Sequence, residues 1–162
     1  MKVYVGLGSN LGDREAHLRE ALRALRALDA SLAVSSVYET APVGGPPQGP
    51  YLNCVVRLET VLEPQELLAF AHRLEDEAGR VRTVKHGPRT LDVDLLLAEG
   101  VSLHTPELTL PHPRMYERGF VLAPLEDLDP ALVPPDWRDR IPGSETLAED
   151  VRRLGTIEGT TS

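Results

Sequence analysis

Hydrophobic and polar residues alternate in four segments of the chain, and each of these segments predicts a β-strand. The four segments are residues 2–8, 34–39, 51–61 and 90–98. Apolar residues recur at helical spacing after Asp13 and again after Pro64, which predicts two amphipathic helices. The order strand, helix, strand, strand, helix, strand is that of the ferredoxin-like βαββαβ sandwich, an α+β fold. Both helices would then cover one face of the sheet and leave the other face open to a ligand.

The rest of the chain has a less regular pattern. Residues 101–110 predict a short hairpin and residues 120–128 a short helix, whereas residues 130–142 predict an irregular proline-rich tail. A last helix is expected at residues 145–154. A chain of 162 residues suits one domain. We therefore expect a single domain over residues 1–162, with its core in about residues 1–130 and a C-terminal extension in residues 131–162.

Composition and charge argue against several classes of protein. The net charge of -8 has the opposite sign to that of most nucleic-acid-binding proteins, so no nucleic-acid partner is expected. Cys54 is the single cysteine, which excludes an intramolecular disulfide and a zinc cluster built from cysteines. The chain has neither a signal-peptide pattern nor an apolar run of about 18 residues. We expect a cytoplasmic monomer with no membrane partner.

The segment of residues 87–97 carries the most informative chemistry. Side chains alternate between the two faces of a strand, so Leu91, Val93, Leu95 and Leu97 are expected on a core face. Asp92 and Asp94 would then emerge together on the opposite face, where their charges repel each other unless a cation lies between them. Mg²⁺ prefers one or two carboxylates together with phosphate oxygens, so the pair predicts a metal platform for a nucleotide. The segment alone is equally compatible with a solvated strand that carries two acids.

A basic loop precedes this strand. Its positive residues are Arg80, Arg82, Lys85, His86 and Arg89. Guanidinium groups match phosphate oxygens in a two-pronged geometry, and phosphoryl transfer depends mainly on positioning and charge neutralisation. Each arginine taken singly is more typical of a solvated loop, but five basic residues beside a carboxylate pair favour a phosphate site.

Two further clusters offer ligand-binding groups. His112 lies between two prolines, and a neutral imidazole can donate a hydrogen bond to a phosphate or a ribose hydroxyl. Tyr51 and Asn53 share one strand face next to a proline- and glycine-rich loop, where Asn53 could read a heterocycle and Tyr51 could stack on it. Taken alone, His112 is more typical of a loop histidine, Phe120 of a core residue, and Tyr51 with Asn53 of a pair on an edge strand. Cys54 is expected on the core face as a buried thiol.

These residues together resemble the 6-hydroxymethyl-7,8-dihydropterin pyrophosphokinase family. The resemblance rests on segments that occur in the family's order: residues 8–11, 51–53, 75–82, 87–94 and 110–120. The segment Gly-Pro-Arg-Thr-Leu-Asp-x-Asp at residues 87–94 is the most specific of them. Family membership implies transfer of pyrophosphate from ATP to the hydroxymethyl group of a reduced pterin, with release of AMP, in folate biosynthesis.

The resemblance also implies roles for particular residues. Two Mg²⁺ ions would be held by Asp92 and Asp94, which would form the catalytic centre together with Arg80, Arg82 and Arg89. The ATP site would comprise His72, Glu75, Arg82, Arg89, Leu95, Thr109, His112 and Arg118. The pterin site would comprise Thr40, Pro42, Val43, Gly44, Tyr51, Asn53 and Phe120, with the pterin stacked between Tyr51 and Phe120. His72, His86 and Glu107 depart from the residues usual in the family.

A second class of function competes with the enzyme. Sheets with βαββαβ order also serve as small-molecule regulatory modules and as RNA-binding modules. An RNA module needs exposed aromatic residues on its sheet and a basic face, which this acidic chain with 4% aromatic residues does not predict. A non-catalytic regulatory module would not need paired acids beside an arginine-rich loop.

Overall fold

The structure is a computed structural model that describes residues 1–40, 50–79, 90–140 and 151–156. Its elements in chain order are β1 (Lys2–Ser9), α1 (Arg14–Arg26), β2 (Ala33–Val34), β3 (Ser36–Thr40), β4 (Tyr51–Glu59), α2 (Pro64–Glu77), β5 (Asp92–Ala98), β6 (Leu103–His104), β7 (Thr109–Leu110), η1 (Met115–Glu117), α3 (Gly119–Leu128), η2 (Pro130–Leu132), α4 (Trp137–Arg140) and β8 (Val151–Thr156). No helix in these parts of the chain has the length and apolar character needed to cross a bilayer.

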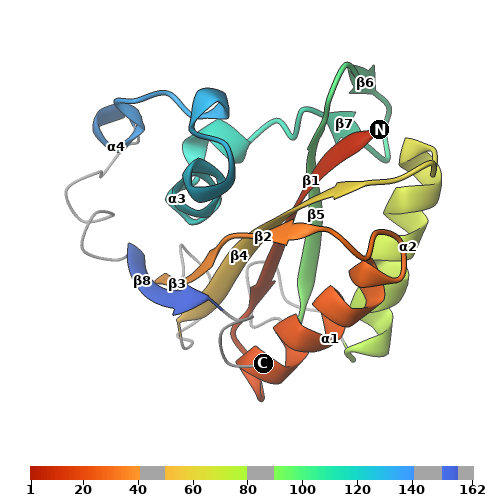
Figure 1. Ribbon diagram of the computed structural model, residues 1–162, viewed down its shortest axis with the longest axis horizontal. Helices are drawn as coiled ribbons and strands as arrows, with labels where there is room; N and C mark the ends of the chain where they lie inside the picture. The colour runs from red at the N-terminus through yellow and green to blue at the C-terminus, as the bar shows by residue number, and fades with distance from the viewer. Residues whose placement is uncertain (41–49, 80–89, 141–150, 157–162) are drawn as a thin grey trace.

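One antiparallel sheet organises the molecule. Its strands lie side by side in the order β5, β1, β4, β3, β8, and β2 also pairs with β4. Helices α1 and α2 cover one face of this sheet, whereas α3 and α4 lie on the other side (Figure 1). The predicted α+β ferredoxin-like arrangement is confirmed, because β1, α1, β3, β4, α2 and β5 follow the βαββαβ order.

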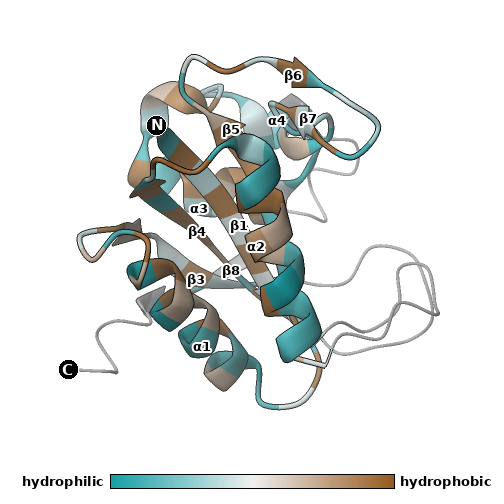
Figure 2. Cartoon of the chain, turned by 90° about the vertical axis from the view of Figure 1, so that its right-hand side faces the viewer, coloured by the Kyte–Doolittle hydropathy of each residue, from teal (hydrophilic) through white to brown (hydrophobic). Residues whose placement is uncertain are grey.

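The two long helices form where the sequence pattern places them. The Asp13 carboxylate accepts a hydrogen bond from the Ala16 N–H at 3.1 Å and so caps the start of α1. Pro64 begins α2, and Gly79 follows its end with a φ of 79°, a conformation that favours glycine. Their apolar stripes and the apolar side chains of the strands bury one core between helices and sheet (Figure 2).

The second face of the sheet is not left open along its whole length, contrary to the expectation from the sequence. Helix α3 packs on it and closes a second core that includes Val55, Leu96 and Leu122. Two tyrosines of the sheet anchor the helix end, because Tyr4 donates a hydrogen bond to Asp129 at 2.9 Å and Tyr38 donates to both oxygens of Asp127 at 3.0 Å. A ligand therefore has to use the part of this face that α3 does not cover.

The prediction of a C-terminal helix at residues 145–154 is wrong for the residues that the structure describes. Residues 151–156 form strand β8, which pairs with β3, while residues 145–150 lie outside the described part of the chain. The strand gains a hydrogen-bonding partner from the open edge of β3, and this long-range pairing outweighs the local helix pattern. The tail at residues 130–142 is also less irregular than expected, since it contains η2 and α4.

Two strands deviate from simple alternation. Ser35 separates β2 from β3 because its hydroxyl accepts the Val55 N–H at 2.9 Å, which replaces a regular ladder contact. The pairing of β1 with β5 shifts register between Tyr4 and Val5, so that Leu96 is an additional residue. Leu97 therefore packs on the α3 side, and its expected place on the same core face as Leu95 is wrong.

Candidate active site

The carboxylate pair lies on the sheet face that is turned away from α1 and α2. Asp92 and Asp94 are partly exposed, whereas Leu91, Val93 and Leu95 are buried in the core under the helices. The predicted alternation is thus confirmed before the bulge at Leu96. Two partly exposed carboxylates on one face are a donor set that suits a hard divalent cation with phosphate oxygens as its other ligands. Within the described residues there is no group of three or more His, Cys, Asp or Glu side chains that could hold a metal without such help.

Two glycines of β1 form a floor beside these acids. Gly8 pairs with Asp92 and Gly6 with Asp94, and on its other side Gly8 pairs with Asn53 of β4. A row of Asp92, Gly8 and Asn53 therefore crosses three strands, with no side chain in its middle. Neither glycine was predicted as a site residue, although two glycines spaced by two in a strand signal a close approach to its backbone.

Asn53 is held firmly at the far side of this floor. Its side-chain amide donates a hydrogen bond to the Thr40 hydroxyl at 2.7 Å, and both residues are buried. An alanine Cβ at Gly8 would lie 2.8 Å from the Asn53 carbonyl oxygen, so that oxygen lies directly above the glycine. Thr40 in turn pairs with Tyr51 across β3 and β4. The structure brings these three predicted pterin-site residues together, while Pro42, Val43 and Gly44 lie outside the described residues.

Glu75 connects α2 to the strand that carries the acids. The residue is 2% exposed, and its carboxylate accepts a hydrogen bond from the backbone N–H of Val93 at 2.9 Å. Val93 lies between Asp92 and Asp94 on an edge strand, where α2 supplies this acceptor in place of a neighbouring strand. His72, one helical turn before Glu75, is exposed.

His112 is attached to the middle of β5. Its backbone N–H donates to the Leu96 carbonyl at 2.6 Å, and its Nδ1 accepts the backbone N–H of Arg114 at 3.1 Å. Partial burial lowers the pKa of His112, and the charges of Arg118 and Arg114 lower it further. The imidazole is therefore neutral at pH 7 and carries its proton on Nε2, since Nδ1 accepts a hydrogen bond.

The other predicted site residues have varied surroundings. Arg118 is the N-cap residue of α3, and its guanidinium lies 5.5 Å from the centre of the Phe120 ring, which is partly buried. Thr109 lies in β7 and is half-buried. Leu95 is 4% exposed, which leaves mainly its backbone for contact with a ligand. Arg80, Arg82 and Arg89, with Lys85 and His86, lie outside the described residues.

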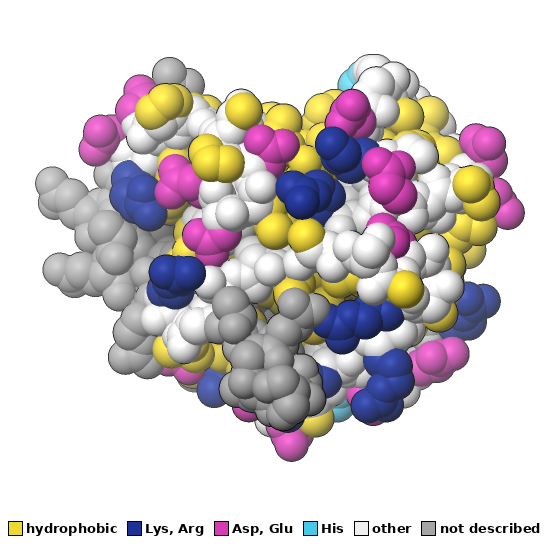
Figure 3. All heavy atoms as spheres, viewed as in Figure 1, with side chains coloured by type: hydrophobic (Ala, Val, Ile, Leu, Met, Phe, Trp, Pro, Cys, Tyr) yellow, Lys and Arg dark blue, Asp and Glu magenta, His cyan; other side chains and the backbone are white. Residues whose placement is uncertain are grey.

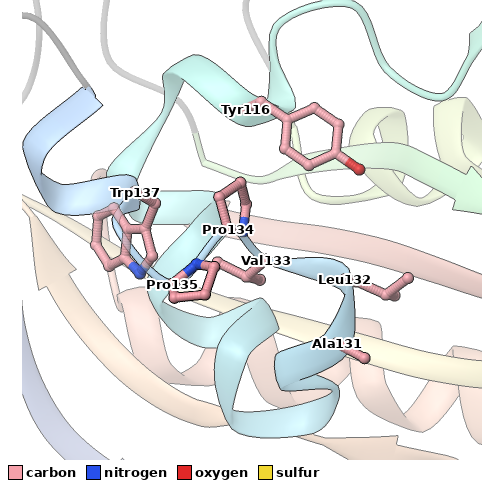
Figure 4. Close-up of a pocket in the computed structure, with 7 residues that line it drawn as sticks. All are labelled: Tyr116, Ala131, Leu132, Val133, Pro134, Pro135 and Trp137. Carbon is pink, nitrogen blue, oxygen red and sulfur yellow. The ribbon is translucent and has the colours of Figure 1, made fainter.

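A groove on the surface involves residues outside the predicted site. A groove formed by the tail and η1 is lined by Tyr116, Ala131, Leu132, Val133, Pro134, Pro135 and Trp137, none of which belongs to the predicted site (Figure 4). Acidic and basic side chains are interspersed on the face drawn in Figure 3.

Cys54 is buried in the core as expected, and burial raises the pKa of its thiol to about 12, which makes it a poor nucleophile.

The fold and these residues define a class: a small α+β protein whose sheet carries a carboxylate pair, a glycine floor and a fixed amide on one face. Comparison with known proteins agrees with this class. The model of the 7,8-dihydro-6-hydroxymethylpterin-pyrophosphokinase family matches residues 4–130. The chain is 50% identical over 127 residues to the 2-amino-4-hydroxy-6-hydroxymethyldihydropteridine pyrophosphokinase of Bacillus subtilis, covering 77% of this chain and 76% of that protein.

A second relative and a solved structure extend the comparison. The pyrophosphokinase of the same name from Aquifex aeolicus is 39% identical over 136 residues, covering 84% of this chain and 85% of the relative. The crystal structure of Plasmodium falciparum HPPK-DHPS matches with a TM-score of 0.63 at 14% identity, over 94% of this chain and 47% of that chain, which supports the fold alone. The chain belongs to the 7,8-dihydro-6-hydroxymethylpterin-pyrophosphokinase family.

Proposed function

We propose that this protein transfers pyrophosphate from ATP to 6-hydroxymethyl-7,8-dihydropterin, with release of AMP, in folate biosynthesis. The hydroxymethyl oxygen attacks the β-phosphorus and loses its proton, and the bond from that phosphorus to the oxygen bridging the α-phosphate breaks. The observation that carries the proposal is the row of Asp92, Gly8 and Asn53, because it places an anionic metal platform and a heterocycle-reading amide on either side of a residue without a side chain. The family's name and the named relatives support the same reaction.

Asp92 and Asp94 are the proposed magnesium ligands. Bound Mg²⁺, in two ions by this proposal, supplies neutralisation of the triphosphate charge and orientation of its oxygens. The partial exposure of both carboxylates and their shared face support this role. The hydrogen bond from the Val93 N–H to Glu75 holds the backbone between Asp92 and Asp94 in place.

The pterin site is proposed around Asn53. Asn53 reads the polar edge of the ring, and the hydrogen bond from its amide to Thr40 fixes its orientation. Tyr51 and Phe120 stack on the two faces of the ring. Pro42, Val43 and Gly44 complete the site with their backbone groups. The absence of a side chain at Gly8 supports a ring that approaches the strand closely.

The triphosphate site is proposed on the other side of the carboxylates. Arg80, Arg82 and Arg89 neutralise phosphate charge, and Arg118 adds a further guanidinium. His112 donates from Nε2 to a phosphate oxygen, which its hydrogen bond from Arg114 supports by leaving Nδ1 without a proton. His72, Glu75, Leu95 and Thr109 border the nucleotide, with Leu95 contributing mainly its backbone.

The remaining proposals concern the whole chain. We place one catalytic domain in residues 1–162, with its core in about residues 1–130, and the family match over residues 4–130 supports that division. Strand β8 shows that the extension at residues 131–162 contributes to the main sheet through its pairing with β3. The protein is proposed to be a cytoplasmic monomer.

Product analysis tests the reaction. Purified protein with Mg²⁺, ATP and the hydroxymethyl pterin is expected to release AMP in amounts equal to the pyrophosphorylated pterin. Asp94→Asn is expected to abolish this turnover, and Asp139→Asn, an exposed acid in α4, serves as the matched control with full activity. Release of ADP, or full turnover in the Asp94 variant, would show that the proposed reaction or metal site is wrong.

A further inference from the structure

Arg14 joins the two strand ends that flank residues 41–49. Its Nη1 donates one hydrogen bond to a Glu39 carboxylate oxygen at 3.1 Å and another to the Pro50 backbone carbonyl at 2.9 Å. Glu39 belongs to the last residues of β3, and Pro50 directly precedes β4. One nitrogen of the guanidinium thus connects the chain before this segment with the chain after it.

The position of Arg14 is not explained by helix stability. It is the first residue of α1, where the positive end of the helix dipole disfavours a cation. Its ion pair with Glu39 is partly shielded, with side-chain exposures of 31% for Arg14 and 19% for Glu39. By contrast, Arg23 of the same helix forms an ion pair with Glu20 in which both side chains are largely exposed. A charge-assisted bond in the shielded setting restrains its partners more strongly than an exposed surface pair does.

Both anchor points are adjacent to residues of the proposed pterin site. Glu39 precedes Thr40, and Pro50 precedes Tyr51, and these two neighbours pair with each other across the sheet. Thr40 in addition accepts the hydrogen bond that orients Asn53. The alternation of β3 turns Val37 into the core under α1, so Glu39 extends to the helix side while Thr40 faces the ligand side. Arg14 therefore acts from beneath the sheet and has no need to touch the ligand.

We infer that Arg14 is a positioning residue for the pterin: by tying Glu39 to the Pro50 carbonyl, it sets the separation of the strand ends that carry Thr40 and Tyr51. This inference rests on the proposed function, because it assigns these strand ends to pterin binding. We expect the effect to be limited to pterin binding. Asp92 and Asp94 belong to β5, and His112 belongs to the segment attached to β5. Arg14 shares no described hydrogen bond with either.

The test compares the two substrates in the full-length protein. The variants are Arg14→Ala, Arg14→Lys and Glu39→Gln, with Arg23→Ala as the matched control from the same helix. Calorimetric titration with a pterin substrate analogue and, separately, with a magnesium complex of a non-hydrolysable ATP analogue gives the two dissociation constants. Steady-state kinetics give KM for each substrate and kcat.

Arg14→Ala is expected to weaken pterin binding about tenfold and to change binding of the ATP analogue less than about twofold. Arg14→Lys is expected to restore part of the loss, because it keeps the charge but not the guanidinium geometry. The control variant should match the original protein for both ligands. Equal weakening of both ligands, or unchanged pterin binding in Arg14→Ala, would overturn the inference. Failure of the original protein to bind the pterin or release AMP would instead overturn the proposed function.

Discussion

Replacement of Gly8 by alanine tests the geometry at the centre of the site. The new Cβ would lie 2.8 Å from the Asn53 Oδ1, whereas ordinary contact begins at 3.4 Å. The Asn53 amide would have to move by about 0.6 Å, and its neighbour Thr40 is buried and leaves little room. This movement would stretch the 2.7 Å hydrogen bond between Asn53 and Thr40.

The magnitude follows from three opposing contributions. Overpacking of a tight site costs about 1–3 kcal/mol. A weakened buried hydrogen bond costs about 1 kcal/mol more. Loss of chain freedom in the unfolded state returns about 0.4–1 kcal/mol in favour of alanine. We therefore expect Gly8→Ala to lower the free energy of unfolding by about 2 kcal/mol and to weaken pterin binding at least about tenfold.

Gly6→Ala is the matched control for stability, because its Cβ would meet the Leu96 side chain at 3.6 Å, an ordinary contact. Its free energy of unfolding is expected to stay within about 1 kcal/mol of that of the original protein. Urea denaturation measures both stabilities, and fluorescence titration with the pterin measures affinity. If Gly8→Ala proves as stable as Gly6→Ala and binds the pterin normally, the close approach of Asn53 to the floor is refuted.

Three further variants examine the carboxylate strand and its supports. Asp92→Asn is expected to reduce AMP release at least about a hundredfold, and retained turnover in a product assay would contradict the metal role. The urea midpoint should change little, because the side chain is partly exposed. Glu75→Ala should lower the free energy of unfolding, measured by urea denaturation, by about 1–3 kcal/mol, because the Val93 N–H loses its buried acceptor. Glu75→Gln keeps an acceptor, so its free energy of unfolding should fall less. His112 has a pKa below its usual 6.5, so the unfolded chain binds its proton first as the pH falls. Its contribution to stability is thus complete above pH 6.5 and declines as the pH falls from 6.5 through the lowered value. Unfolding curves at pH 7.5 and 5.5 should differ more for the original protein than for His112→Gln, and equal differences would refute this linkage.

Much of the site could be predicted because it depends on local alternation. Asp92 and Asp94 share a face because β5 is extended there, and the apolar residues between them identify the core side. Alternation failed two residues later, at the bulge near Leu96, because a bulge is decided by how two strands pair rather than by the sequence of either one. Leu97 for this reason packs against α3.

Residues that act by contact across the chain escaped prediction. Gly8 is defined as a site residue by Asn53 beside it in the sheet, and Arg14 by the two strand ends that it joins. Neither relation follows from spacing along the chain. The hydrogen bond from the Val93 backbone to Glu75, which joins α2 to β5, is likewise a contact that spacing along the chain does not predict.

The sequence by itself determined the two long helices, the main strands and the face on which most of the strand residues lie, because hydrophobic periodicity and end-capping act over a few neighbouring positions. Only the tertiary structure decided that residues 151–156 form a strand and that α3 covers part of the second sheet face. Both outcomes depend on surfaces contributed by distant parts of the chain: an open edge of β3 needs a backbone partner, and apolar side chains such as Val55 need a cover.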